Sequence, residues 1–99
     1  MIMIVFSYPA IKQFIEKHID AADAMNNWYN IMTITDFANY QELKHMFGTV
    51  EGTGNDRYVF DIKGNKYRIV AMIHFNVRTV YIRFVGSHKQ YDKIDAKTI

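Results

Sequence analysis

The segment FVGSHKQYDKI, residues 84–94, concentrates side chains that can move a proton, hold an anion or donate a hydrogen bond. After an apolar pair it contains, in order, Gly86, Ser87, His88, Lys89, Gln90 and Tyr91. Histidine has an ordinary pKa of about 6.5 and can act as an acid or a base near neutral pH. Tyrosine, with an ordinary pKa of about 10, is a poorer base unless nearby cations lower that pKa. From the residues alone, this segment is either a solvated turn or part of an active site.

A short helix is predicted to begin at His88. Ser87 and Gln90 have the spacing of a capping box, in which each side chain bonds the backbone N–H of the other residue. His88 and Tyr91 are three residues apart and would lie on one side of this helix. Because the first N–H groups of a helix are unpaired and carry the positive end of its dipole, we expect the helix start to suit a phosphate.

Two β-strands are predicted over residues 57–63 and 66–73, joined by the turn signal Gly64-Asn65. Alternation along them makes one face aromatic and aliphatic and the other partly basic. A two-residue turn would produce two opposed pairs, Lys63 with Lys66 and Asp61 with Arg68.

A third strand is predicted over residues 79–85. It would place Tyr81 and Arg83 on one face and Val80, Ile82 and Phe84 on the other. We expect Arg68 and Arg83 to converge with the histidine and tyrosine on one anion. A structural ion pair between Arg68 and Asp61 across the hairpin is the competing interpretation.

The first half of the chain is predicted to be helical after a short strand over residues 2–6. Ser7, with Pro9 in the first turn, begins a helix whose apolar face is Ile11, Phe14, Ile15 and His18. Asp20 begins a second helix, whose buried face is Met25, Trp28, Tyr29 and Met32. A third helix follows Asn39, with Glu42 in capping-box position, and ends at Gly48. The glycines of residues 50–56 indicate a loop.

Composition is typical of one globular domain, residues 1–99, with 49% apolar and 15% aromatic residues. There is no cysteine and no apolar run of membrane-spanning length, so we expect a cytoplasmic protein without disulfides or sulfur-based zinc sites. Three basic and seven acidic residues occur up to Asp56, whereas nine basic and three acidic residues follow it. This positive second half is typical of a surface for phosphates or for an acidic partner.

The blocks GNDRYVFDIKGNKYRIVAMIHF and VYIRFVGSHKQYDKIDAKTI resemble the C-terminal half of HigB-family toxins, which are RelE-superfamily ribonucleases of type II toxin-antitoxin systems. The N-terminal strand, the IKQFIEKH helix and Trp28-Tyr29 also fit that family. The resemblance implies an α+β fold with a small antiparallel β-sheet, N-terminal helices packed on one face and a short C-terminal helix.

The resemblance also implies an mRNA interferase, a ribosome-dependent endoribonuclease that cleaves translated mRNA. We expect this cleavage to use no metal or cofactor and to proceed through attack of the 2′-hydroxyl. Its implied partners are the ribosome, mRNA and a helix-turn-helix antitoxin similar to HigA, through which alone operator DNA would be bound. Arg68 matches the family's strand arginine at the scissile phosphate, and His88 and Tyr91 match its His-x-x-Tyr. The expected RNA-binding residues are Arg57, Lys63, Lys66, Arg83, Lys89 and Lys93.

Two departures leave the general base open: Val59 and Asp61 stand where better-known RelE-type toxins carry lysines. His18, His45 and His74 lie on separate elements without ligand spacing, so no metal site is expected. Two non-catalytic alternatives remain, an RNA-binding domain or an antitoxin-docking module. The first lacks the aromatic RNP1 pattern of an RRM.

Overall fold

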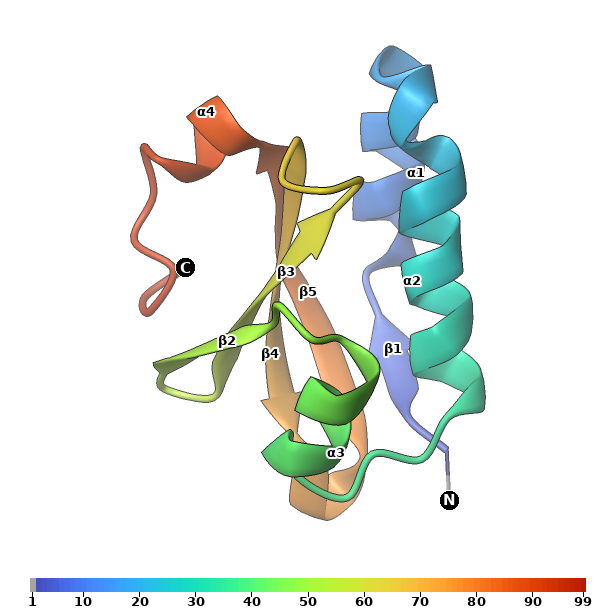
Figure 1. Cartoon of the computed structure of the whole chain (residues 1–99), viewed down its shortest axis with the longest axis vertical. Helices are drawn as coiled ribbons and strands as arrows, with labels where there is room; N and C mark the ends of the chain where they lie inside the picture. Colours follow the sequence, from blue (N-terminus) through green and yellow to red (C-terminus); the bar gives the residue numbers. More distant parts are fainter. Residues whose placement is uncertain (1) are drawn as a thin grey trace.

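A five-stranded sheet with strand order β1-β5-β4-β3-β2 forms the centre of the protein (Figure 1). The computed structural model describes residues 2–99. Its strands are β1 (Ile4–Phe6), β2 (Glu51–Gly54), β3 (Arg57–Ile62), β4 (Tyr67–His74) and β5 (Thr79–Ser87). The α+β fold predicted from the sequence is confirmed. The sheet is mixed, not wholly antiparallel, because β1 pairs in parallel with β5 while the other neighbours are antiparallel.

Three helices cover one face of this sheet, and the fourth lies against the other face (Figure 1). The helices are α1 (Tyr8–Lys17), α2 (Ala22–Ile34), α3 (Tyr40–Met46) and α4 (His88–Tyr91). Two 3₁₀ turns, Ile19–Ala21 and Phe75–Val77, complete the regular structure. None of the helices within residues 2–99 is long and apolar enough to cross a membrane.

The main core lies between α1 to α3 and the sheet. Met25, Trp28 and Met32 recur at helical spacing on α2 and are buried, which confirms the predicted face. Tyr29, predicted on the same face, is only partly buried. The Trp28 ring meets Phe60 of β3 edge-on, with ring centroids 5.2 Å apart. Its indole Nε1 is buried and has no hydrogen-bond partner among residues 2–99.

The helix starts depart in part from the predicted caps. Ser7 precedes α1 with φ 77°, in the left-handed region, and its side chain forms no capping hydrogen bond within the described part of the chain. Asp20 does not begin α2, because it lies in a 3₁₀ turn and its carboxylate bonds the hairpin instead. Asn39 does cap α3, accepting from the Glu42 N–H at 3.0 Å. The Glu42 carboxylate accepts a hydrogen bond from the Ala38 N–H, whereas a capping box would have it accept from the Asn39 N–H.

The predicted loop over residues 50–56 is wrong, because Glu51–Gly54 forms strand β2 and pairs with β3. Asn55 and Asp56, with φ 54° and 61°, make the tight connection. Two successive residues with positive φ are typical of a type I′ hairpin turn, so the chain reverses here within two residues. The glycines that indicated a loop belong to a short edge strand.

The β3–β4 hairpin has the predicted register. Asp61 lies opposite Arg68, and Ile62 lies opposite Tyr67. Phe60 and Ile69 therefore face the main core, while Val59 and Val70 face the opposite side. The register places the Arg68 side chain directly beside a carboxylate.

A β-bulge in β5 overturns one predicted face. Val70 pairs with Phe84 but Ala71 pairs with Ile82, so Arg83 is an extra residue in the strand. Val80 and Ile82 point into the main core, as predicted, whereas Phe84 turns to the opposite face. There it joins a second apolar cluster, formed by Val59, Val70 and Ala96 with Phe84, Tyr91, Ile94 and Ile99 around them. This second cluster holds α4 against the sheet.

Gly86 makes the junction between β5 and α4 possible. A Cβ placed there would lie 2.4 Å from Phe84 Cζ and 2.9 Å from Gln90 Oε1. We predict that Gly86→Ala lowers the free energy of unfolding by about 1–3 kcal/mol, as overpacking does elsewhere. Gly48→Ala is the matched control, because nothing lies within 4 Å of a Cβ at Gly48. Equal denaturant midpoints for the two variants would contradict this packing.

Candidate active site

Arg68 lies near the start of β4, between the hairpin turn and α4. Its Nε forms an ion pair with Asp61 Oδ1 at 3.1 Å, and its Nη1 donates to the Asn65 and Tyr67 carbonyls at 2.7 and 3.3 Å. The side chain is only 11% exposed. Within residues 2–99, Nη2 makes no hydrogen bond. The predicted structural ion pair is therefore present, and one amino group remains for a ligand.

Tyr91 of α4 covers this guanidinium. Its ring centroid lies 5.7 Å from Arg68 Cζ and 6.4 Å from the Phe84 ring centroid. Burial raises the pKa of Tyr91, and the Glu51 carboxylate adds to the rise, while Arg68 opposes it. The phenol therefore keeps its proton at neutral pH. Tyr91 is placed to donate a hydrogen bond or to stack on a base. It is not placed to act as a base, because that would require nearby cations to lower its pKa and the pKa is raised instead.

His88 is the first residue of α4, and its side chain is about half exposed. Its Nδ1 lies 3.1 Å from Asp92 Oδ2. An ionised carboxylate can only accept a hydrogen bond, so Nδ1 donates and Nε2 is left free to accept or return a proton. Asp92 was not identified from the sequence. The four-residue spacing from His88 was the signal that could have found it.

The start of α4 is held by the predicted capping box. Ser87 Oγ accepts from the Gln90 N–H at 3.2 Å, and Gln90 Oε1 accepts from the Ser87 N–H at 2.8 Å. The His88 N–H donates to the Lys66 carbonyl at 3.1 Å. These three N–H groups are thus occupied, so the expectation that the N–H groups of the helix start would be unpaired is wrong for these three, while phosphate binding there stays a prediction. The last bond ties α4 to the turn of the β3–β4 hairpin.

Asp20 gathers the side chains at that turn. Its carboxylate accepts hydrogen bonds from Lys66 and from the Tyr67 hydroxyl, the latter at 2.6 Å. Lys63 donates to the Asp20 carbonyl at 3.0 Å. The hydrogen bonds from Lys66 and Tyr67 hold the pKa of Asp20 well below its usual range, and Asp20 in turn raises the pKa of both partners. Sequence reasoning missed this role, because Asp20 and the turn are far apart along the chain.

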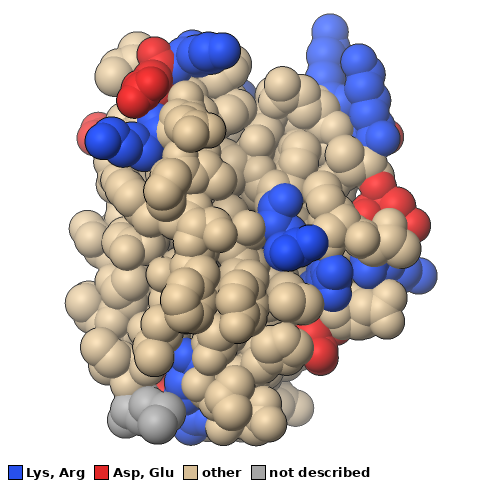
Figure 2. All heavy atoms as spheres, turned by 180° about the vertical axis from the view of Figure 1, so that it is seen from behind, with Lys and Arg blue, Asp and Glu red and all other residues tan. Residues whose placement is uncertain are grey.

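The remaining predicted RNA-binding residues fall into two groups. Arg57 and Arg83 both donate to the main-chain oxygen of Ile99, with Arg57 Nη2 at 2.7 Å and Arg83 Nε at 3.3 Å. Lys89 and Lys93 are exposed on and just after α4, and within residues 2–99 their side chains form no ion pair. Basic side chains stand at both upper corners of the face in Figure 2, with uncharged surface between them.

The predicted catalytic residues thus occupy adjoining elements. Arg68 and Tyr91 are in contact, and His88 lies one helical turn before Tyr91. A guanidinium with one free amino group, a protonated phenol and a histidine with a free nitrogen can stabilise a phosphate and transfer a proton. Across residues 2–99, no group of three or more His, Asp or Glu side chains is placed to hold a metal ion.

Comparison with known proteins gives consistent matches. Residues 21–94 match the family model described as HigB_toxin, RelE-like toxic component of a toxin-antitoxin system. The chain is 27% identical over 94 residues to the mRNA interferase HigB of Escherichia coli O6:H1, covering 93% of this chain and 91% of the relative. It is 32% identical over 85 residues to the mRNA interferase toxin HigB of Escherichia coli K12, covering 84% and 82%. The mRNA interferase HigB of Shigella flexneri matches equally well.

The Asp20 contacts predict a pH-dependent stability. Because folding lowers the pKa of this carboxyl group, its contribution is present above the unfolded pKa of about 3.9 and fades as pH falls below it. We expect Asp20→Asn to lower the melting temperature at pH 7 and to differ less from the wild type at pH 3. Asp23→Asn is the control, since Asp23 is exposed and outside this network. A difference that stays constant between pH 7 and pH 3 would argue against the ion pair.

Proposed function

The chain belongs to the HigB family of RelE-like toxins, and from this premise we propose that it cleaves mRNA as the toxic component of a toxin-antitoxin pair. The observation that carries the proposal is the match to relatives named mRNA interferase, over 82–91% of their length. The contact between Arg68 and Tyr91, beside His88, supplies groups suited to that chemistry.

The proposed reaction is an in-line attack of an RNA 2′-hydroxyl on the adjacent phosphorus. The O2′–P bond forms as the P–O5′ bond breaks, which gives a 2′,3′-cyclic phosphate and a 5′-hydroxyl. One group must remove the 2′ proton, one must protonate the 5′-oxygen, and donors must stabilise the charge on the phosphoryl oxygens. No metal or cofactor takes part in this scheme.

We assign the catalytic roles of Arg68, Tyr91 and His88 from the side-chain atoms that can still donate or accept a hydrogen bond. Arg68 Nη2 and the Tyr91 hydroxyl donate to the phosphoryl oxygens, because both are donors at neutral pH. His88 Nε2 transfers a proton, and the Asp92 carboxylate stabilises the imidazolium that forms. Whether His88 serves as base or acid depends on which reacting oxygen lies nearer to Nε2.

The basic residues around these groups would hold the RNA backbone. Lys89 and Lys93 are exposed and unpaired with acids in the described chain, so they can bind phosphates directly. Lys63 and Lys66 would have to share their charge between Asp20 and RNA. Arg57 and Arg83 already donate hydrogen bonds to the main-chain oxygen of Ile99. They would contribute mainly through long-range electrostatic attraction of the RNA backbone.

We propose that cleavage depends on the ribosome, because this set of residues contains one evident proton-transfer group. Tyr91 retains its proton, so the second transfer and the alignment of the 2′-hydroxyl need outside help. Orientation of bound reactants can lower a barrier by several kcal/mol. The decoding site, which holds mRNA in a defined geometry, is the proposed source.

Arg68→Ala tests the assignment of the guanidinium. We expect cleavage to fall by a factor on the order of 10² to 10³, as when one oxyanion donor is lost. The melting temperature should also fall, because Asp61 loses its partner. Asp61→Asn is the matched control, since it breaks the same ion pair but leaves the guanidinium in place. If Asp61→Asn reduces cleavage as much as Arg68→Ala, then Arg68 acts only through the fold.

Cleavage products test the reaction and the dependence on the ribosome. Purified protein would be incubated with free mRNA and with programmed ribosomes, each with and without EDTA, restoring magnesium where ribosomes need it. We expect cutting only on ribosomes, no need for a transition metal, and 2′,3′-cyclic phosphate ends. Efficient cutting of free RNA would refute ribosome dependence, and 3′-hydroxyl ends would refute attack by the 2′-hydroxyl. Intact mRNA under all conditions would refute the nuclease.

A further inference from the structure

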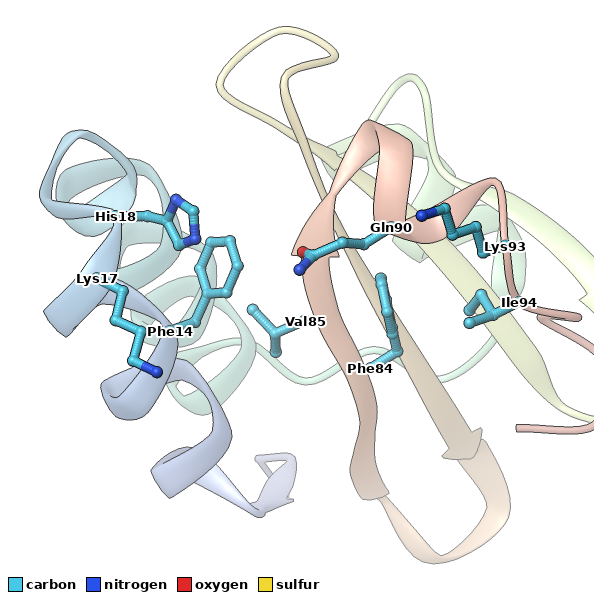
Figure 3. Close-up of a pocket in the computed structure, with 8 residues that line it drawn as sticks. All are labelled: Phe14, Lys17, His18, Phe84, Val85, Gln90, Lys93 and Ile94. Atoms are coloured by element: carbon cyan, nitrogen blue, oxygen red, sulfur yellow. The ribbon is translucent and has the colours of Figure 1, made fainter.

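A groove lies between α1 and α4, beside the second half of β5. Two adjoining cavities of about 380 and 570 Å³ form it, and both are lined by Phe14, Lys17, Phe84 and Val85. Figure 3 shows the first cavity, with Phe14 and His18 on the α1 side, Gln90 on the α4 side and Val85 between them. We call the two cavities together the α1–α4 groove. The proposed cleavage reaction leaves this groove without a role.

Two stacked rings form the α1 wall of the groove. The centroids of the Phe14 and His18 rings are 4.2 Å apart, and the rings are only 16° from parallel. Both residues are partly exposed, as is Phe84 on the opposite wall. Within residues 2–99, the ring nitrogens of His18 make no hydrogen bond or ion pair. A flat ligand can extend such a stack and bond the free ring nitrogens at its polar edge.

The rim of the groove is positively charged. Lys17 of α1 and Lys93, just after α4, are exposed and form no ion pair within residues 2–99. Among these residues, no acid lines the first cavity. Glu16 lines the second cavity, together with Lys17 and Arg83. Unpaired lysines beside aromatic walls offer phosphate contacts next to a stacking surface.

Gln90 adds hydrogen-bond donors to the groove. Its Oε1 accepts from the Ser87 N–H at 2.8 Å, and its Nε2 makes no hydrogen bond within the described part of the chain. The bond to Ser87 fixes the side chain, so the direction of the remaining donors is set before a ligand arrives. The carbonyl oxygens and ring nitrogens of an unpaired base are acceptors that suit such donors.

We propose that the α1–α4 groove is an RNA subsite that holds one unpaired nucleotide outside the cleaved linkage. Its base enters the first cavity, extends the Phe14–His18 stack and accepts a hydrogen bond from Gln90 Nε2. Its flanking phosphates contact Lys17 and Lys93. A volume of about 380 Å³ is near the lower end of the range for small-molecule pockets, about 300–1,000 Å³, and suits a single base. This inference rests on the proposed function, because it assigns a second contact to the same RNA.

The groove adjoins the proposed cleavage site through α4. Gln90 of this helix and Lys93 just after it line the groove, while His88 and Tyr91 of the same helix belong to the site. One RNA strand bound at both places would pass α4, so the bound base would fix which linkage lies beside His88. The positive rim favours a nucleotide over an apolar peptide, because every nucleotide carries a negative charge.

Affinity for a short single-stranded RNA tests the phosphate contacts. The strand would be 2′-O-methylated so that it cannot be cleaved, and binding would be measured by fluorescence anisotropy at several salt concentrations. We expect Lys17→Ala to weaken binding and to reduce the slope of log affinity against log salt by about 0.7, the value for one phosphate contact on a single strand. Lys12→Ala is the matched control, because Lys12 is exposed on the same helix and does not line the groove.

The base contact has a separate test. His18→Ala removes one ring of the stack and should weaken binding of this RNA by about fivefold or more, as loss of one stacked base does. The same variant should bind an abasic strand of equal length as the wild type does, which a misfolded protein would not. His18→Phe keeps a flat ring and should retain most of the RNA affinity.

Three results would overturn the inference. These are no binding of the RNA by the wild type, equal RNA affinity for the wild type, Lys17→Ala and His18→Ala, and an equal loss on the abasic strand. Self-association that His18→Ala abolishes while RNA binding persists would assign the groove to a second copy of the chain instead. None of these measurements uses cleavage. A protein that binds RNA through the groove but leaves mRNA intact on ribosomes would refute the nuclease and keep the subsite.

Discussion

The extra residue in β5 is the constraint on which the rest of the structure depends. Before Arg83 the strand sends Val80 and Ile82 into the main core, and after it Phe84 points to the other face. A regular strand would have placed all three in one core and left the second cluster without Phe84. Because Phe84 reaches that face, α4 has an apolar surface to pack on. The bulge thus separates the core that stabilises the fold from the cluster that holds the proposed site.

Two carboxylates hold the cations near α4 in place. Asp61 binds Arg68 from the neighbouring strand, and Asp20 binds Lys66 from the 3₁₀ turn after α1. Each pair fixes a long side chain that would otherwise lose conformational entropy when it meets a phosphate. Each pair also lowers the net positive charge offered to a ligand. The cations near the hairpin turn are therefore held in place, but acidic partners offset part of their charge. Lys89 and Lys93 carry positive charge that no acidic partner in the described chain offsets.

Local patterns in the sequence predicted the parts of the fold that local interactions determine. The capping box at Ser87, the register that pairs Asp61 with Arg68, and the buried face of α2 follow from spacings of a few residues. The bulge at Arg83 was missed, because the alternation of apolar and polar residues does not reveal an added residue in a strand. Strand β2 was missed, because its glycines are typical of a loop. Asp20 was misassigned to a helix start because its partners are long-range. The catalytic roles of Arg68, His88 and Tyr91 stay predictions.

Trp28 gives the protein a built-in optical reporter. It is the single tryptophan of the chain, and its buried ring packs on Phe60 in the core covered by α1 to α3. Tryptophan fluorescence therefore arises from one buried position, on the opposite side of the sheet from α4. An altered emission spectrum after a change on α4 would mean that the disturbance had passed through the sheet. An unaltered spectrum would show that the two sides of the molecule respond independently, without any added dye or label.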